Sequence, residues 1–552
     1  MKTKYILLSA LSAIAFCACD NYLTAEYQGS SQTAEQIGQT VDAVPERINS
    51  AVSGMYAKLG TPYGYFGSSS SRADDGGFFS ICLSNDMNSG DLINSVSNYD
   101  WYSVALEYSD RTPNYANPRL RSGLLYNIIY ATGEVIASVP ETTTNPELKA
   151  KRGQAKAIRA FAYLNMVPYF QFRYALDTVA PTVPIMADEK TEMDPLNNPR
   201  APMNKMYNYI LSDLTDAIAD LDGFKRENKG IIDQQVAYGL RARAYLNMER
   251  WAEAAADAEK AVAGYEPYAM SELTQPGFNE ASDHNWMWAV LIPQSMAGSA
   301  LSTFPSQLGS FSGNSYTAWG AIYRCINKLL WDKIPATDVR KAWWLDENLH
   351  SPYLEGLTWA DDDAGVVYSG QEIATAEIAD VKQKMLPFTN VKFGQRSGVG
   401  SPYNDGDWCL MRAEEMILIQ AEATAKAGDL AKGKSILENF VKTYRDPAFV
   451  SKAGDVEAFS NEVLLQRRIE LWGEGFGQSD RMRLGKHIVR FIPGRETNVP
   501  VDYQFNIAND NPWLRMRFTL TELNGNASVE QNTGGEQPKS GEGAELRDGV
   551  TD

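Results

Sequence analysis

Two groups of acidic residues have types and spacing that could do chemistry. The adjacent pair Glu414–Glu415, and Glu470 with Glu474, could each supply the two carboxylates that a glycosidase places around a sugar bond. Glu414–Glu415 stands at the start of a predicted helix, where carboxylates interact favourably with the helix dipole. Glu470 and Glu474 lie next to Arg467–Arg468, at spacings that favour ion pairs. We therefore predict structural roles for these acids and no catalytic residues.

The residues that commonly bind metals are poorly arranged for it. His284, His350 and His487 are far apart and form no HxxxH or HExxH pattern, so no zinc site is predicted. The acidic loops Asp86–Asp91 and Asp361–Asp363 resemble parts of a calcium loop but lack its glycine at position 6 and its closing glutamate. Nucleotide-binding and serine-hydrolase motifs are also missing. We predict no cofactor and leave structural calcium open as an alternative.

Two segments combine aromatic rings with short polar side chains. Asn98, Asp100 and Trp101 lie in one segment, and Tyr316 and Trp319 lie in the other. Flat rings suit the C–H face of a sugar, and neighbouring amides and carboxylates can bond its hydroxyls. These five residues are therefore the predicted ligand-binding residues. The alternative is that both tryptophans anchor loops to the core.

An internal repeat indicates the elements that must position these residues. Residues 159–166 and 241–248 agree at seven of eight positions, and a weaker copy runs over 416–433. The small residues of the second copy follow the spacing of tetratricopeptide helix hairpins, in which alanines let two helices approach closely. The sequence thus predicts a mainly α fold, a tetratricopeptide-like helical-hairpin scaffold.

The rest of the chain is less regular. We assign residues 36–266 and 408–532 to the scaffold, with residues 267–407 as a large, irregular, loop-rich insertion. Six of the twelve tryptophans fall within residues 286–344 of this insertion. Residues 60–98, rich in Gly, Ser and Asp, predict a loop region. The low-complexity residues 533–552 predict a disordered tail.

The N-terminus indicates export. Lys2 and Lys4 precede the apolar run 5–16, which has the length of a signal peptide and is too short to span a bilayer. The stretch Phe16–Cys19 resembles a bacterial lipobox, so residues 1–18 are predicted to be a lipoprotein signal peptide and Cys19 the lipidated residue. Residues 19–35 then form a polar, flexible tether. The alternative is a signal peptide cleaved nearby without lipidation.

The composition and charge of the chain exclude some classes of partner. The chain of 552 residues is 44% hydrophobic and 22% charged, as in ordinary globular proteins. Its net charge of −18 repels the phosphate backbone, so nucleic acid is not a predicted partner. After Cys19, the cysteines Cys82, Cys325 and Cys409 are odd in number, and a disulfide framework is not expected.

Several blocks resemble a known family. The run QRRIELWGEGFGQSDRMR at 466–483 is similar to the signature ERRxELxxEGxRxxDLxR of the SusD/RagB family of Bacteroidetes nutrient-uptake lipoproteins. Residues 526–532 resemble its closing NPxLxQN, and 152–169 and 209–221 resemble further blocks. The chain departs from the signature with Gln for Glu at 466, Gly for Arg at 477 and Ala for Pro at 527.

The resemblance implies a function. Members are surface-exposed outer-membrane lipoproteins, anchored by lipid such as palmitate, that capture oligosaccharides for a SusC-like TonB-dependent transporter and break no bond. By approximate chain position it implicates Trp101 and Trp319, with Asn98, Asp100 and Tyr316, in ligand binding. Two alternatives remain: a peptide-binding lipoprotein like the RagB branch, with the same transporter partner, and a secreted glycosidase.

Overall fold

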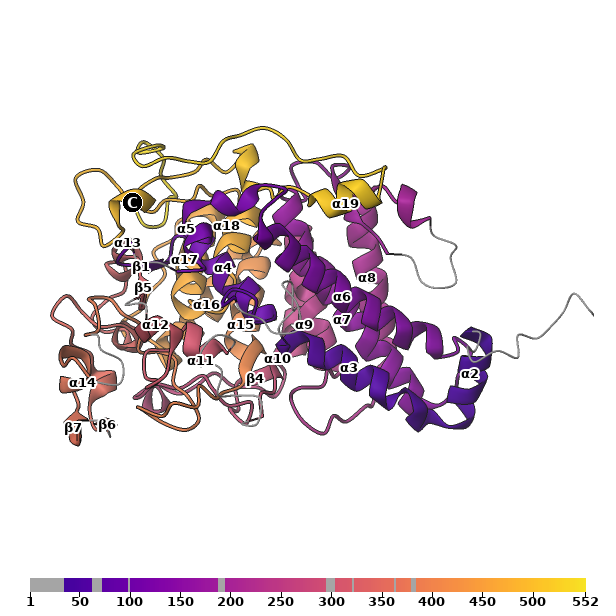
Figure 1. Ribbon diagram of the computed structural model, residues 1–552, viewed down its shortest axis with the longest axis horizontal. Helices are drawn as coiled ribbons and strands as arrows, with labels where there is room; N and C mark the ends of the chain where they lie inside the picture. Colours follow the sequence, from indigo (N-terminus) through magenta and orange to yellow (C-terminus); the bar gives the residue numbers. More distant parts are fainter. Residues whose placement is uncertain are drawn as a thin grey trace, which may run out of the picture.

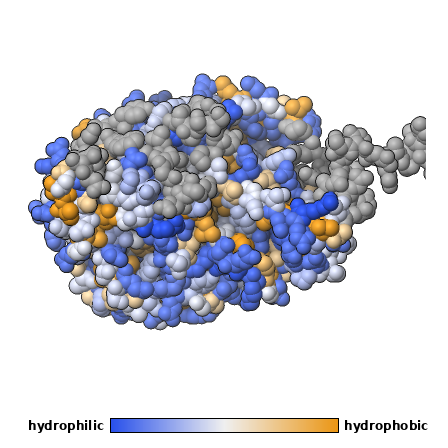
Figure 2. All heavy atoms as spheres, turned by 60° about the horizontal axis from the view of Figure 1, so that its bottom comes forward, coloured by the Kyte–Doolittle hydropathy of each residue, from blue (hydrophilic) through white to orange (hydrophobic). Residues whose placement is uncertain are grey.

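A computed structural model describes most of the chain. It covers residues 34–61, 72–97, 100–186, 194–293, 303–319, 322–361, 364–378 and 384–552. The predicted signal peptide, Cys19, most of the tether, Asn98 and residues 362–363 of one acidic loop lie outside these residues. No helix within the described segments is both long and apolar enough to cross a membrane. The face shown in Figure 2 is largely hydrophilic, with hydrophobic residues in small scattered groups.

Helical hairpins make up the right-hand side and the middle of the molecule in the view of Figure 1. These helices are α2 (Ala34–Ala43), α3 (Asn49–Gly60), α6 (Ala116–Ser138), α7 (Pro146–Phe170), α8 (Met203–Asp220), α9 (Gln234–Asn247), α10 (Trp251–Val262), α15 (Ala413–Lys426), α16 (Leu430–Tyr444) and α17 (Val456–Glu470). From α6 to α10 each helix packs on the next, and α15 packs on α10, α16 and α17. The predicted mainly α, hairpin-based fold is confirmed.

Capping and small residues explain these hairpins. The side chain of Asn145 accepts hydrogen bonds at the start of α7, and Asp233, Asp429 and Asp455 do the same for α9, α16 and α17. A Cβ atom added at Gly433 would lie 2.7 Å from Cβ of Ala425, so only glycine fits where α16 crosses α15. This close approach is the one that the repeat predicts.

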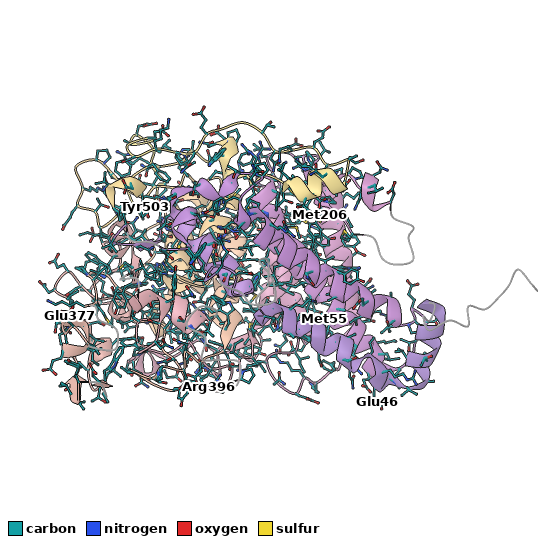
Figure 3. The ribbon with its side chains drawn as sticks, in the orientation of Figure 1. Glu46, Met55, Met206, Glu377, Arg396 and Tyr503 are labelled. Carbon is teal, nitrogen blue, oxygen red and sulfur yellow. The ribbon has the colours of Figure 1, made fainter. Side chains whose placement is uncertain are left out.

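The region between α10 and α15 contains mostly short elements. They are β4 (Trp286–Val290), α11 (Phe304–Gln307), α12 (Tyr316–Trp319), β5 (Arg324–Ile326), α13 (Lys328–Trp331), β6 (Thr358–Asp361), β7 (Val366–Ser369) and α14 (Glu372–Thr375), with 3₁₀ turns η4 (Met270–Glu272), η6 (Val339–Trp343) and η7 (Pro352–Leu354). β4 pairs antiparallel with β8 (Trp408–Arg412), which joins the two ends of this region directly ahead of α15. Figure 3 places Arg396 and Glu377 on this side, whereas Met55 and Met206 lie among the helices.

The predicted loop over 60–98 is wrong in part, because it contains α4 (Phe78–Ser89) and β1 (Leu92–Asn94). Every residue of α4 is buried. Its polar side chains bond the signature segment: Asp86 accepts the N–H groups of Gly475 (3.0 Å) and Gly477 (2.8 Å), and Asn85 accepts that of Gln478 (3.0 Å). Tertiary contacts therefore fix a helix that local composition does not favour.

The tail prediction is also wrong. Residues 533–552 form turns and extended segments that pack on the fold, and Asp548 is buried in an ion pair with Arg468 (2.8 Å). In Figure 1 the C-terminal segment runs along the top of the molecule, after α18 (Gly477–Leu484) and α19 (Leu520–Gly525). A low-complexity composition is ordered here with the help of the buried Arg468, which binds Asp548 of the tail.

The remaining short elements connect these parts. They are η1 (Pro45–Ile48), α5 (Ser103–Glu107), η2 (Ser109–Arg111), β2 (Pro181–Pro184), η3 (Pro195–Asn197), β3 (Arg200–Pro202), η8 (Val501–Tyr503) and η9 (Pro512–Leu514). One hydrophobic core runs through the scaffold and the insertion, from Met55 to Trp472 and beyond. Cys82, Cys325 and Cys409 are buried free thiols.

Candidate functional site

Pairing of two short strands brings the predicted aromatic segments together. β1 pairs antiparallel with β5, so the segment that ends at Trp101 lies beside the segment that follows α12. The backbone N–H of Trp101 donates to Oη of Tyr316 (2.8 Å), and that hydroxyl donates to Oδ1 of Asp100 (3.0 Å). Three of the five predicted ligand residues therefore meet, although 215 residues separate Trp101 from Tyr316.

Asp100 is the buried residue that supports this arrangement. Its side chain has no exposed surface, and Arg324 binds it at 2.6 Å. Burial alone would raise the pKa of Asp100, but the Arg324 guanidinium outweighs burial and holds that pKa below its usual value. Asn94 donates a further hydrogen bond at 2.7 Å. Asp100 therefore supports the site and presents no carboxylate to a ligand, which corrects its predicted role as a ligand contact.

Trp101 is the member of the group that reaches solvent. It is half-buried and packs on a small cluster of Ala73, Tyr316 and Ile322. The guanidinium of Arg72 lies 4.3 Å from its ring centroid, a cation–π contact, while Asp74 binds Arg72. The ring is thus held by contacts on several sides while keeping part of its surface accessible.

Two arginines of this site were missed by sequence reasoning. Arg324 is a lone basic residue in the apolar stretch 322–326, and such a residue in a buried strand needs an acidic partner. That signal could have identified Arg324, but nothing in the sequence links Arg72 to Trp101. Asn98 lies outside the described residues, and the structure describes only the backbone of Trp319, at the end of α12.

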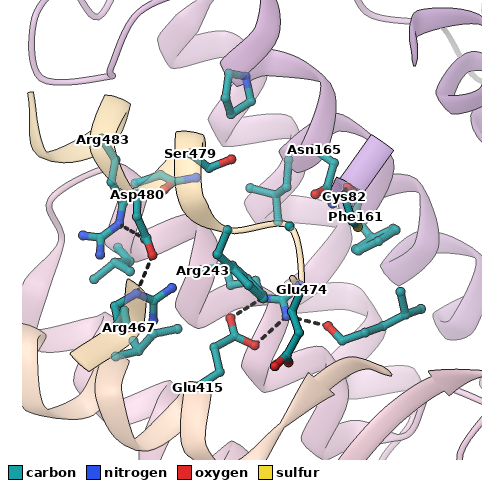
Figure 4. A pocket seen from close by; sticks show the side chains of 18 of the residues that line it. Cys82, Phe161, Asn165, Arg243, Glu415, Arg467, Glu474, Ser479, Asp480 and Arg483 are labelled. Carbon is teal, nitrogen blue, oxygen red and sulfur yellow. Dashed lines mark hydrogen bonds and ion pairs between the residues drawn. The ribbon is translucent and has the colours of Figure 1, made fainter. Parts of the chain in front are cut away.

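Residues of the family-like signature line a small cavity, together with residues of other helices (Figure 4). The cavity holds about 80 Å³, far less than the 300–1,000 Å³ typical of ligand pockets. Arg243 pairs with Glu415 at 2.6 Å, and Asp480 pairs with both Arg467 (2.7 Å) and Arg483 (2.8 Å). The charged side chains at this cavity neutralise one another, so the cavity is structural.

The acids first considered for catalysis are buried in the same kind of network. Glu470 binds Arg340 (3.0 Å), Arg412 (2.7 Å) and Arg445 (2.8 Å), and all four side chains are at most 1% exposed. Burial would raise the pKa of Glu470, but the arginines hold that pKa well below the usual range. Glu474 pairs with Arg412 and Lys392. Both acids form ion pairs, but not with the neighbouring Arg467 and Arg468 that the sequence suggested, because Arg467 pairs with Asp480 and Arg468 pairs with Asp91 and Asp548. These carboxylates cannot reach a substrate.

The acidic residues considered for calcium also bind protein groups. Asp86 accepts the two backbone N–H groups described above, and Asp91 binds Arg468 (2.8 Å) and Arg481 (2.7 Å). Asp361 is buried and accepts the N–H of Ala364 (2.9 Å). These carboxylates are therefore engaged within the fold.

Comparison with known proteins finds one matching family model and several similar structures. Residues 365–540 match the model of the SusD family, and no curated protein matches the chain. A SusD-like carbohydrate-binding protein from Bacteroides vulgatus is similar in structure, with a TM-score of 0.68 and 21% identity over 88% of this chain and 96% of that one.

Two further solved structures share the fold. A SusD superfamily protein from Bacteroides thetaiotaomicron has a TM-score of 0.64 and 19% identity over 88% of this chain and 99% of that chain. A laminarin-binding SusD-like protein has a TM-score of 0.58 and 17% identity over the same shares. The signature at 466–483 lies inside the segment that matches the SusD family model, and the chain shares the fold of these solved structures.

Proposed function

We propose that this protein is a cell-surface lipoprotein that captures oligosaccharides and delivers them to a SusC-like TonB-dependent transporter in the outer membrane, without breaking a bond. The observation that carries the proposal is Trp101, a half-buried ring held by Tyr316 and Arg72 above the buried Asp100–Arg324 pair. A ring fixed in this way loses little entropy when a sugar stacks on its free surface. The carbohydrate-binding names of related structures support the same ligand class.

Binding without catalysis is also consistent with the acids. Glu414, Glu470 and Glu474 are buried in ion pairs with arginines, so a retaining or inverting pair of carboxylates cannot be assembled from them. Trp319 follows Tyr316 in α12 and is proposed as a second ring of the same platform, together with Asn98 near Trp101.

The first experiment is a calorimetric titration of the soluble protein, beginning after Cys19, with plant, host and microbial oligosaccharides. Trp101→Ala and Trp319→Ala are compared with Trp251→Ala. Trp251 is a matched control because it is also half-buried and has a cation, Lys426, 4.5 Å from its ring centroid, but it lies on α10 of the scaffold. We expect saturable binding of one glycan class that Trp101→Ala weakens by roughly 2 kcal/mol or more.

The other outcomes are informative. Equal loss in Trp251→Ala would mean that the effect is a general loss of packing. Binding of peptides and of no sugar would favour the RagB-like alternative, and new reducing ends in the same samples would show a glycosidase.

The lipid anchor and the partner need separate tests. Radiolabelled palmitate should enter the full-length protein in a Bacteroidetes host and be lost in Cys19→Ala, which should also leave the outer-membrane fraction. A SusC-like transporter should co-purify with the anchored protein. Membrane retention of the unlipidated variant would contradict the proposed anchor.

A further inference from the structure

A groove lies between α6 and α19, away from the aromatic site. It has a volume of about 670 Å³, within the range of ligand pockets. Its lining comes from α6, from β2 and from α19 with the segment just before it. Neither Trp101 nor Tyr316 belongs to this lining, and α19 lies well to the right of α12, the helix of Tyr316, in the view of Figure 1. The groove is therefore a separate candidate for binding.

Helix α6 contributes two tyrosines to this groove. Tyr126 and Tyr130 are four residues apart, so both lie on the same face of the helix. Tyr126 is half-buried, and its hydroxyl donates to the carbonyl of Pro184 (2.9 Å), which fixes the ring. Tyr130 is 65% exposed. The lining thus combines a fixed ring with an accessible one, and accessible rings can stack on the C–H surface of a sugar.

Two polar side chains of the lining have unused hydrogen-bonding groups. Asn127 is half-buried, and its amide forms no hydrogen bond within the described residues. Glu522 is also half-buried; in the described part of the chain its carboxylate forms no ion pair and accepts one long hydrogen bond, from Asn526 (3.4 Å). An amide both donates and accepts, and a carboxylate accepts from several donors. Together they match the hydroxyl groups of a sugar.

The other amides of the lining hold the walls of the groove. Asn526 donates to the carbonyl of Asn198 (2.7 Å), and Asn198 donates to the carbonyl of Ile185 (2.9 Å). These bonds tie the end of α19 to the segments that follow β2 and precede β3. The groove is thus formed without a ligand, which reduces the ordering that binding requires.

The charges in the lining favour a neutral ligand. Arg119 and Glu522 are its charged residues among those described, and they have opposite signs. The nearby Arg200 is not part of the lining, because its guanidinium stacks on Phe518 at 4.9 Å and donates to three backbone carbonyls. An anionic ligand would be repelled by Glu522 and a cationic one by Arg119, whereas a neutral ligand avoids both penalties.

We propose that this groove binds a neutral sugar unit, which stacks on Tyr130 and forms hydrogen bonds through its hydroxyls with Asn127 and Glu522. The inference rests on the function proposed above, because it takes the occupant to be part of a captured glycan. It gives the protein two separate glycan contacts, this groove and Trp101. A long polysaccharide held at both would bind more tightly than at either one.

Nitration of Tyr130 reports directly on this groove. The soluble protein, beginning after Cys19, is treated with tetranitromethane, and nitration of each tyrosine is followed by peptide mass spectrometry. The probes are laminarihexaose, cellohexaose and mannohexaose, with a tryptic digest of casein as the peptide probe. At ten times the Kd about nine-tenths of sites are filled, so nitration of Tyr130 should slow roughly tenfold. Tyr245, half-buried on α9 and outside the lining, is the internal control and should not change.

The expected result is protection of Tyr130 by at least one hexasaccharide, and the same protection in Trp101→Ala. Calorimetry with that hexasaccharide should show that Tyr130→Ala and Asn127→Ala each weaken binding to the groove by roughly tenfold or more, whereas Tyr245→Ala keeps it. Protection by no hexasaccharide, protection by the casein peptides alone, or protection that is lost in Trp101→Ala would overturn the proposal. If glycans still bind through Trp101 in these cases, only this inference fails and the proposed function stands.

Discussion

The signature region and the aromatic site use buried ion pairs for opposite purposes. In the signature region, residues 466–483, Glu470 and Glu474 form ion pairs with Arg340, Lys392 and Arg412. We call this a closed cluster, because each of these charges is paired with another charge of the same cluster. Two of the cations come from the loop-rich insertion, so the cluster joins that insertion to the scaffold helix α17.

In the aromatic site, the Asp100–Arg324 pair instead ends, through the hydroxyl of Tyr316, at a ring that reaches solvent. A closed cluster stabilises the fold, whereas a cluster that ends on an exposed ring orients a surface. Under the proposed function, the accessible ring at the end of the cluster, and not the buried charge, distinguishes a binding site from a structural cluster.

Glu470→Gln is the variant for which we expect the largest effect, and it tests the role of the closed cluster. The change leaves Arg340, Arg412 and Arg445 with one anion fewer in a fully buried site, so we expect a loss of about 3–5 kcal/mol in the free energy of unfolding. Urea denaturation followed by circular dichroism measures it. The control is Glu457→Gln, whose exposed pair with Lys486 should contribute less than about 1 kcal/mol. Similar losses in both variants would show that the closed cluster contributes no more to stability than an exposed ion pair.

Acid sensitivity should concentrate in the same region. Burial opposes the charge of Glu422, but Arg483 and Lys426 outweigh it and lower its pKa from 4.5 to about 2. Its contribution is therefore complete above pH 4.5 and is lost as the pH falls toward 2. Glu422→Gln should cost roughly 3 kcal/mol at pH 7, and the difference from the wild type should vanish near pH 2. A difference that is independent of pH would contradict this assignment.

The comparison also explains what the sequence could and could not predict. The hairpins follow from local patterns, such as the repeat at 159–166 and 241–248 and the glycine at 433. The arginines beside Glu470 in the sequence suggest that it is paired, but its actual partners Arg340, Arg412 and Arg445 are distant in the chain. The helix α4 and the ordered tail depend instead on partners far away in the sequence, such as Gly477 for Asp86, 391 residues apart, and Arg468 for Asp548, 80 residues apart. A single sequence carries no signal for such pairs.

A smaller loss of stability is expected from a change in the C-terminal tail, residues 533–552. Asp548→Asn removes the charge that Arg468 binds, although Asp91 still binds Arg468 at 2.8 Å. We expect a loss of about 1.5–3 kcal/mol, because hydrogen bonds to charged groups are in this range, together with faster proteolysis within residues 533–552. Limited proteolysis with mass spectrometry measures the cleavage. Glu545→Gln, an exposed change in the same tail, is the control. Unchanged protection in Asp548→Asn would mean that other contacts order the tail.

The smallest expected effect is on glycan binding, and it tests whether Tyr316 orients Trp101 through its hydroxyl or only packs against it. Tyr316→Phe removes the hydroxyl that joins Trp101 to Asp100 but keeps the ring. Glycan binding should weaken by about 0.5–1.5 kcal/mol, because Trp101 loses one support while its own surface is intact. Tyr353→Phe is the matched control, since its hydroxyl accepts a hydrogen bond from the indole of Trp343 (2.7 Å) in the core of the insertion. Both variants should lose similar stability, but only Tyr316→Phe should weaken binding. Equal binding by the two variants would show that Trp101 is positioned without Tyr316, and the distinction between a closed cluster and an orienting one would then rest on Arg72 alone.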